Sequence, residues 1–321
     1  MPKVLIIGAC GQIGSELTFK LKDIHGFEQV VASDIGYHNL EVVNSGTFEI
    51  VDAQDYNSIK ICVEKHDIDT IYLMAAMLSA TGEKYPMKAW DLNMNSLFHV
   101  LNLAKDGFIK RVFWPSSIAV FGPTTPTENT PQHTIMEPTT VYGITKQVGE
   151  RWCEYYNTKY GVDVRSIRYP GIISWKTMPG GGTTDYAVEI YHQAILDKNY
   201  DCFLSENTEL PMMFMDDAIN ATVNLMQAPS EQVKIRSSYN LAAISFTPLS
   251  ISEEIKKHIP DFKITYTPDF RQQIADSWPK SIDDSSARQD WNWSHDFNLE
   301  KMTTEMLTQL GRKYQDSEIN S

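Results

Sequence analysis

The stretch KVLIIGACGQIG, residues 3–14, constrains the fold more than any other part of the chain. Residues 4–7 are all branched and apolar, which favours a strand that is covered on both faces. Glycines follow at positions 8, 11 and 14, and residues 15–25 then carry apolar side chains at helical spacing before Gly26. Strand, glycine turn and helix together can hold a pyrophosphate, because the helix N-terminus offers N–H groups and glycine permits close approach. We therefore predict a dinucleotide site, with a turn that binds nothing as the alternative.

A second strand, residues 29–34, ends in an acid about 20 residues beyond the last glycine. At that distance the Asp34 carboxylate could accept the adenosine ribose hydroxyls, although it could also cap a helix or simply end the strand. Residues 35–39 contain no Arg or Lys that could receive a 2′-phosphate. The sequence therefore predicts NAD rather than NADP.

Composition sets the class of protein. With 321 residues, 42% of them hydrophobic, the chain has core enough for one large α/β domain or for a domain with a smaller lobe. A net charge of −13 argues against a broad surface for nucleic acid or anionic membrane. The first apolar segment is too short for a signal peptide or a membrane span, so we expect a soluble cytoplasmic protein. The four cysteines are widely separated and suggest neither a metal site nor disulfides.

Strand and helix patterns alternate through the first half of the chain. Further strands are predicted at 48–55, 70–76, 111–117 and 162–173, with helices at 58–69, 90–107 and 141–161 and a loop at 121–140. Alternation of this kind predicts a Rossmann-type, doubly wound parallel sheet.

Beyond residue 173 the pattern changes. A glycine-rich loop leads into a helix, a helix at 213–229 and a strand at 237–243 follow, and residues 262–293 are rich in turns and aromatic side chains. We predict a dinucleotide-binding domain over 1–173 to which 212–243 returns. A smaller C-terminal substrate-binding lobe would comprise 174–211 and 244–321, with the substrate cleft between the two.

The segment YGITK carries a candidate catalytic pair. Tyr142 and Lys146 stand four residues apart and share one face of the predicted helix. A phenol has a pKa near 10, and a neighbouring ammonium together with a cationic nicotinamide would lower it. Tyr142 is therefore a candidate general base for an alcohol, although most such pairs lie on a solvated helix face. Ser116 and Ser117 follow the strand at 111–117, at the edge where such sheets bind ligands, and could contact the reacting oxygen or merely end the strand.

Together GACGQIG, Asp34, LMAA, PSSIAVFG, YGITK and RYPGII resemble the extended short-chain dehydrogenase/reductases. The resemblance implies that Ser117, Tyr142 and Lys146 are catalytic, with Ser116 the less favoured serine. It implies that Lys146 also holds the nicotinamide ribose and that Asn93 orients this lysine through water. The cofactor-binding residues implied by the turn and the resemblance are Gly8, Gly11, Gln12, Ile13, Gly14, Asp34, Asp52, Ala53, Leu73, Ala75, Ala76, Asn93, Tyr142, Lys146, Tyr169 and Ile172.

The segments MLSATGE, MPGGGTTDYAVEIY and DSWPKSIDDSSARQDW narrow the resemblance to the short-chain-type L-threonine 3-dehydrogenases. That group uses NAD in threonine catabolism, oxidising the 3-hydroxyl to 2-amino-3-ketobutyrate without a metal. The backbone N–H groups of residues 180–182 could receive the threonine carboxylate, or the segment could be a flexible loop with a Thr cap. The implied substrate-binding residues are Ser79, Ser117, Tyr142, Gly180, Thr183, Thr184 and Trp278.

Two other functions remain open. Nucleotide-sugar epimerases and dehydratases use the same Ser, Tyr and Lys, but they need cations for a diphosphate, and here Arg236, Arg271 and Arg288 are scattered. An NAD-sensing scaffold would have no reason to keep both Tyr142 and Lys146. The apolar helices at 93–104 and 141–160, together with the resemblance, predict a homodimer.

Overall fold

The computed structural model describes residues 2–180 and 182–319. At its centre is a parallel sheet with the strand order β3-β2-β1-β4-β5-β7. Its strands are β1 (Val4–Ile7), β2 (Val30–Asp34), β3 (Phe48–Ile50), β4 (Thr70–Leu73), β5 (Arg111–Phe113) and β7 (Asp163–Arg165). The chain runs outward on one side of β1 and returns to β4 on the other, so a ligand crevice opens at the carboxyl ends of these two strands. The predicted doubly wound α/β fold is confirmed.

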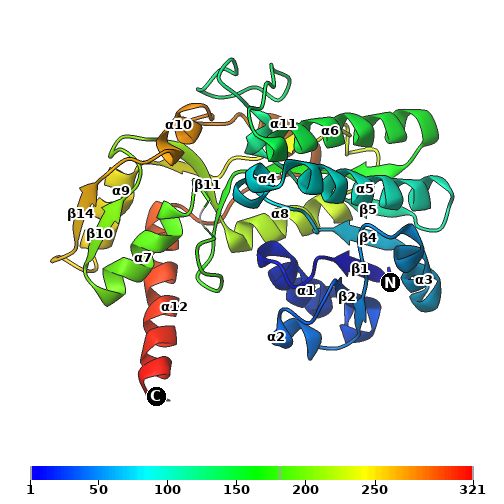
Figure 1. Ribbon diagram of the computed structural model, residues 1–321, viewed down its shortest axis with the longest axis horizontal. Helices are drawn as coiled ribbons and strands as arrows, with labels where there is room; N and C mark the ends of the chain where they lie inside the picture. Colours follow the sequence, from blue (N-terminus) through cyan, green and yellow to red (C-terminus); the bar gives the residue numbers. More distant parts are fainter. Residues whose placement is uncertain (1, 181, 320–321) are drawn as a thin grey trace.

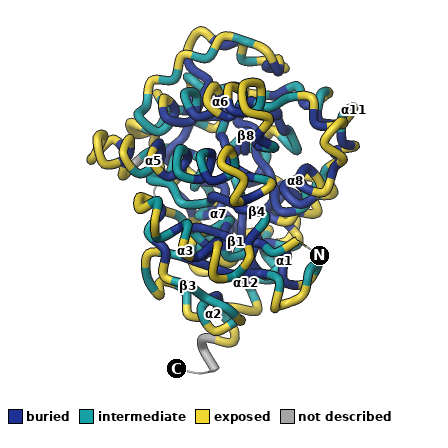
Figure 2. The backbone as a smooth tube through the Cα atoms, turned by 90° about the vertical axis from the view of Figure 1, so that its right-hand side faces the viewer, coloured by how far each residue is buried: buried dark blue, intermediate teal, exposed yellow. Residues whose placement is uncertain are grey.

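Helices cover both faces of this sheet. Those of the first half are α1 (Gln12–His25), α2 (Leu40–Val43), α3 (Tyr56–His66), α4 (Ser79–Lys84), α5 (Pro86–Lys105) and α6 (Val141–Tyr160). One apolar cluster joins the sheet to α3, α5 and α6. A second cluster joins the other face to α1, α8 (Met215–Gln227) and α11 (Ser285–Trp291). In Figure 2 the central strands β1 and β4 are drawn in the dark blue of buried residues.

The segment 162–173 was predicted as one strand, and that prediction is wrong. It forms β7, β8 (Ile167–Tyr169) and β9 (Gly171–Ile173), which belong to three different sheets. β8 lies between β6 (Ser116–Ser117) and β12 (Tyr239–Asn240), and β9 pairs with β11 (Leu210–Phe214), which in turn pairs with β13 (Ile244–Phe246). The breaks fall at Ser166, whose carbonyl accepts the Tyr239 N–H at 3.0 Å, and at Pro170, which has no N–H to donate.

Several other boundaries differ from the expectations. The strands predicted at 48–55 and 70–76 end at Ile50 and Leu73, the strand predicted at 111–117 is divided into β5 and β6, and the helix predicted from 213 begins at Met215 because residues 210–214 form β11. The division of 111–117 arises where the chain leaves the central sheet for a neighbouring one.

The remaining elements gather beside the sheet, as Figure 1 shows. They are α7 (Tyr186–Leu196), β10 (Asn199–Cys202), α9 (Pro248–Lys256), β14 (Lys263–Tyr266), α10 (Arg271–Asp276) and α12 (Leu299–Ile319), and most of them share a third apolar cluster. Residues 213–241 pack on the α1 face of the sheet, and so do Trp291 and Trp293 from the range predicted for the lobe. The domain boundaries stay a prediction. Within residues 2–180 and 182–319, none of the helices has the length and apolarity needed to cross a membrane.

Candidate active site

The glycine turn between β1 and α1 requires glycine at two of its three positions. Gly8 has φ +90°, and a Cβ there would lie 2.5 Å from the Ala75 nitrogen. A Cβ at Gly14 would overlap the Gly8 carbonyl oxygen. Gly11 differs, because its Cβ would meet only the Gly8 oxygen, at 3.4 Å. Gly11 is also the N-cap of α1, where no side chain of the described residues caps the helix. The turn therefore leaves open space in front of a helix N-terminus, as a bound phosphate requires.

Asp34 ends β2 beside this turn. Its carboxylate accepts the Cys10 N–H at 2.9 Å and the Ile35 N–H at 2.8 Å. These contacts hold the carboxylate between the glycine turn and the residue that follows β2. An acid fixed in this place can accept ribose hydroxyls with its remaining lone pairs.

A groove of about 260 Å³ joins the glycine turn, Asp34 and the ends of β3 and β4. Of the residues predicted for the cofactor, it is lined by Gly8, Gly11, Asp34, Asp52, Ala53, Ala75 and Ala76. It is also lined by Ile7, Ile35, Val51, Gln54, Met74 and Leu92, which were not predicted. Each of these six lies next to a predicted residue in the sequence, and that adjacency is the available signal. Leu92, the neighbour of Asn93, enters the groove from α5.

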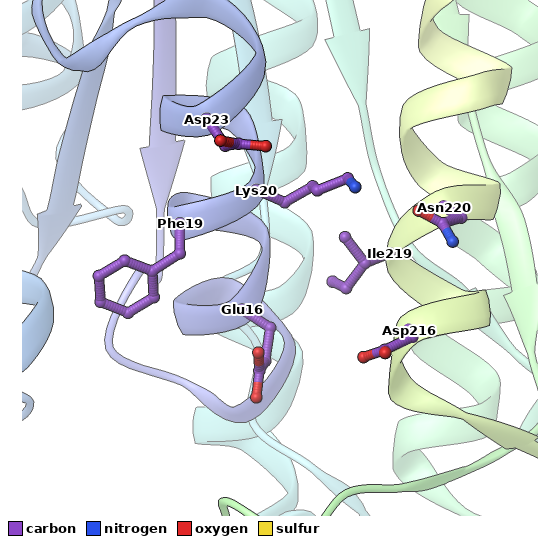
Figure 3. Close-up of a pocket in the computed structure, with 7 residues that line it drawn as sticks. All are labelled: Glu16, Phe19, Lys20, Asp23, Asp216, Ile219 and Asn220. Atoms are coloured by element: carbon purple, nitrogen blue, oxygen red, sulfur yellow. The ribbon is translucent and has the colours of Figure 1, made fainter. Parts of the chain in front are cut away.

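A second cavity, of about 340 Å³, lies between α1 and α8. Its lining residues are Glu16, Phe19, Lys20, Asp23, Asp216, Ile219 and Asn220, and Lys20 and Ile219 extend into the space between the two helices (Figure 3). None of these residues was predicted for the site, and none lines the groove at Asp34. Although the cavity between α1 and α8 has the larger volume, the groove at Asp34 is therefore the better candidate for the cofactor site. Among the described residues, no group of three or more His, Cys, Asp and Glu is placed to hold a metal ion.

The candidate catalytic side chains come from β6 and from the first turns of α6. Thr140 caps α6 by accepting the Gly143 N–H at 3.1 Å, so the helix begins at the residue before Tyr142. The Lys146 Nζ lies 5.5 Å from the centre of the Tyr142 ring and donates to the Pro115 carbonyl at 2.5 Å. Ser117 accepts the Ala119 N–H at 3.2 Å, and its hydroxyl is near enough to Tyr142 to act on the pKa of the phenol. The structure thus brings together the serine, tyrosine and lysine.

The electrostatics of the pair differ from the expectation. Burial raises the pKa of Tyr142 to about 12, and the hydrogen bond with Ser117 offsets only part of this rise. Burial also lowers the pKa of Lys146 to about 7, against the opposing charges of Cys153 and Glu150. Without a bound cofactor the pKa of Tyr142 is therefore raised by burial. The prediction that Lys146 together with a cationic nicotinamide lowers the phenol pKa stays a prediction.

The two serines of β6 have different partners. Ser116 donates to the Glu150 carboxylate at 2.7 Å, and Glu150 forms a buried bidentate ion pair with Arg168. The Ser116 hydroxyl is therefore held within this network, whereas the Ser117 hydroxyl is near enough to Tyr142 to lower the pKa of the phenol. This arrangement favours Ser117 as the serine of the site.

Asn93 makes contacts that the sequence did not predict. Its side chain accepts the Met77 N–H at 2.8 Å and donates to the Met77 carbonyl and to the Thr145 hydroxyl, each at 3.1 Å. It thereby joins the end of β4 to the residue next to Lys146. The predicted role of orienting Lys146 through water stays a prediction.

Other predicted cofactor residues lie in or against the core. Leu73 is buried in the cluster on the α3 side, and Ile13 and Ile172 pack against the opposite cluster. Tyr169 is 4% exposed, and its hydroxyl is hydrogen-bonded to Thr222 of α8. The Tyr169 hydroxyl therefore already has a hydrogen-bond partner within the protein. Gln12, partly buried, is the first residue of α1.

The glycine-rich loop before α7 already binds a carboxylate. The N–H groups of Gly180 and Gly182 donate to the same Asp185 oxygen, at 2.7 and 2.8 Å. A substrate carboxylate would have to displace Asp185 to use them, so the expectation that these N–H groups are free is wrong. Gly181, predicted with them, lies outside the described residues.

The other predicted substrate residues come from three segments. Thr183 is 8% exposed, while Thr184 lies against Gly171 of β9, where a Cβ would approach the Thr184 Cβ to 2.9 Å. Ser79 is the first residue of α4 and is partly exposed. Trp278 packs both against the lobe cluster and against the cluster of residues 118–121, which directly follow Ser117. This contact brings a residue of the predicted lobe close to the candidate serine, Ser117.

The fold and the groove define a class of protein. The chain belongs to the NAD dependent epimerase/dehydratase family, whose pattern matches residues 4–242. The predicted extended short-chain dehydrogenase/reductase resemblance is thereby confirmed, and a nicotinamide cofactor and oxidoreductase chemistry follow from the same membership.

Two solved structures and one further relative are similar to this chain over nearly its whole length. A partial consensus L-threonine 3-dehydrogenase is 55% identical, with a TM-score of 0.94 over 97% of this chain and 100% of the other. An L-threonine dehydrogenase from Cupriavidus necator is 54% identical, with a TM-score of 0.93 over 96% of this chain and 100% of that one. An uncharacterized epimerase/dehydratase of Staphylococcus haemolyticus is 46% identical over 98% of this chain and 100% of its own length. The narrower resemblance to L-threonine 3-dehydrogenases is confirmed as well.

Proposed function

We propose that the protein oxidises the 3-hydroxyl of L-threonine to 2-amino-3-ketobutyrate with NAD. The observation that carries this proposal is the 55% identity, over 97% of the chain, to an L-threonine 3-dehydrogenase structure. The assembled Ser117, Tyr142 and Lys146 give it a chemical basis, because an alcohol oxidation needs a group that takes the hydroxyl proton.

In this mechanism bound NAD supplies the hydride acceptor. The groove at Asp34 holds the adenosine half, and the open side of Gly11 leaves space for the pyrophosphate. Ser117 donates a hydrogen bond to the substrate oxygen, and Tyr142 takes the hydroxyl proton onto its phenolic oxygen. Because burial holds the pKa of Tyr142 near 12, this transfer needs positive charge nearby, from Lys146 and from the oxidised nicotinamide ring. Turnover should therefore increase with pH as long as Lys146 keeps its charge.

The choice of NAD over NADP rests on Asp34. Its carboxylate is fixed by the Cys10 and Ile35 N–H groups, so it cannot easily turn away from a 2′-phosphate. No lysine or arginine occurs in residues 35–39 to offset the repulsion. A ribose with both hydroxyls free fits this arrangement.

The nucleotide-sugar alternative needs cations for a diphosphate. The three arginines considered from the sequence are each held by a carboxylate: Arg236 by Asp163 at 2.5 Å, Arg271 by Asp269 at 2.7 Å and Arg288 by Asp284 at 2.7 Å. A diphosphate would have to compete with these ion pairs, which favours a small zwitterion as substrate.

The decisive experiment compares substrates with one preparation of the protein. We expect NAD reduction with L-threonine, much less with D-threonine and L-allo-threonine, and no competition by UDP-glucose. Thr184→Ala should raise KM, and Trp278→Leu should lower kcat as well if the indole excludes water from the site. Thr308, which is exposed on α12, provides the control variant Thr308→Ala. Epimerisation of UDP-glucose with threonine inert would refute the proposal.

We further propose a homodimer formed through α5 and α6. Trp152 and Tyr155 on α6 are 37% and 46% exposed, and Trp90 on α5 is 37% exposed. Phe98 of α5 lies 5.0 Å from the Trp152 ring, so the aromatic surface continues across both helices. A second copy of the same two helices would cover this surface under two-fold symmetry.

A further inference from the structure

Trp114 lies beside the catalytic lysine, although it was not among the residues predicted for the site. It follows β5, immediately before Pro115, and is 3% exposed. The face of its ring lies 4.6 Å from the Lys146 Nζ. This is shorter than the 5.5 Å between the same nitrogen and the Tyr142 ring.

The position of the indole is fixed by glycine on α6. A Cβ at Gly149 would overlap the tip of the Trp114 ring, and it would approach Leu97 of α5 to 3.2 Å. The absence of a side chain at Gly149 therefore lets the indole enter between the two helices. The Trp114 backbone is fixed as well, because its N–H donates to the Arg165 carbonyl at 3.0 Å.

The buried ammonium of Lys146 needs a neighbouring group that stabilises its charge. Its side chain is 2% exposed, and its Nζ donates to the Pro115 carbonyl at 2.5 Å. Over residues 2–180 and 182–319, no carboxylate forms an ion pair with it. Glu150, one helical turn away, is held by Arg168 at 2.7 Å. A buried ammonium without a carboxylate is stabilised by carbonyl oxygens and by the face of an aromatic ring.

We propose that Trp114 is a positioning residue whose indole face holds the Lys146 ammonium against the Pro115 carbonyl, on the side of α6 that carries Tyr142. This inference rests on the proposed role of Lys146 in holding the nicotinamide ribose. The ring acts through Lys146 and touches neither substrate nor cofactor in this scheme. Its replacement should therefore change the pH at which Lys146 loses its charge, in addition to any effect on packing.

The test measures NADH binding by calorimetry across pH, which needs no turnover. In the wild-type protein, NADH affinity should decline as the pH rises and Lys146 becomes neutral. In Trp114→Leu the charged lysine is less stable, so the midpoint of this decline should move to lower pH by about one unit. The dissociation constant at pH 8 should then rise about tenfold. Trp114→Phe keeps a weaker aromatic face and should show a rise of about threefold.

A second buried tryptophan separates this role from packing. Trp291 is 5% exposed and packs against the Tyr239 and Trp293 rings, at 5.8 and 6.0 Å. Trp291→Leu should lower Tm while leaving the pH midpoint of NADH binding unchanged. A wild-type midpoint in Trp114→Leu would overturn the proposal, and if that variant does not fold, a wild-type midpoint in Trp114→Phe would do so. Failure of the wild-type protein to oxidise threonine would refute the proposed function but leave the NADH midpoints to decide the role of Trp114.

Discussion

Replacing Gly11 by alanine should weaken cofactor binding while leaving the fold intact. The backbone at Gly11 has φ −73° and ψ 173°, an extended conformation that alanine adopts freely. The new methyl group would meet only the Gly8 oxygen, at 3.4 Å, an ordinary contact. Alanine is a poorer N-cap than glycine, by about 0.5–1 kcal/mol, but it restricts the unfolded chain by a similar amount. The expected change in Tm is therefore within about 2 °C.

The same methyl group should interfere with NAD. Gly11 lines the groove, so its Cβ would enter the space in front of the α1 N-terminus where a phosphate oxygen must approach. Loss of one charge-assisted hydrogen bond is worth about 1.5–3 kcal/mol. The dissociation constant for NADH should therefore rise about 10- to 140-fold.

Gly14→Ala provides the matched comparison. Its Cβ would overlap the Gly8 carbonyl oxygen, which belongs to the backbone and cannot turn aside. This variant should lose about 3 kcal/mol of stability, with a Tm lower by about 6 °C. Calorimetry with NADH and thermal unfolding separate the two outcomes. If Gly11→Ala binds NADH as the wild type does, the pyrophosphate does not lie over this turn and the reasoning fails.

Four other changes test separate parts of the structure. Asp34→Ala should weaken NAD binding and narrow the preference over NADP in steady-state kinetics; equal wild-type efficiency with both cofactors would contradict the role of this carboxylate. Tyr142→Phe should lower kcat by about 10² to 10⁴ with little change in the calorimetric NADH affinity, whereas near-normal turnover would assign the base elsewhere. Burial alone would raise the pKa of Asp163, yet hydrogen bonds and charge from Arg165 and its neighbours hold it well below the usual range. The stability from this pairing is present above the unfolded pKa near 3.9 and declines as pH decreases toward the folded value. Asp163→Asn should therefore lower Tm at pH 7 and reduce the dependence of Tm on pH in the acid range. A wild-type dependence of Tm on pH in this variant would contradict the role of Asp163. Trp152→Glu should convert a dimer to a monomer in light scattering, and a wild-type protein that is monomeric and fully active would refute the proposed interface.

Local spacing accounts for the parts of the site that could be predicted from sequence. Tyr142 and Lys146 lie together because four residues make about one helical turn, and Gly8 and Gly14 meet within one short turn. The partners of Trp114 and Asp185 were harder to predict. The Trp114 ring acquires its role only when α6 packs over it. The Asp185 carboxylate binds N–H groups whose availability depends on the loop conformation.

The fold, too, was predictable from sequence only where it depends on local patterns. Alternating strands and helices predicted the central sheet, because a covered parallel strand is apolar along its whole length. That property also made 162–173 look like a single strand. Its division among three sheets depends on partners far along the chain, Met212 for β9 and Tyr239 for β8, and hydrophobicity alone does not reveal them.

The two faces of the central sheet are completed at different times during synthesis. The cluster on the α3, α5 and α6 side draws its members from residues 5–164, so it can close once α6 and β7 have left the ribosome. The cluster on the α1 side needs α8 and then Trp291 and Trp293. At ordinary elongation rates the wait is on the order of 10 s, during which a wide apolar face of the nascent chain stays uncovered. The cell must shield that face, and a fragment ending near residue 173 would retain it permanently and aggregate.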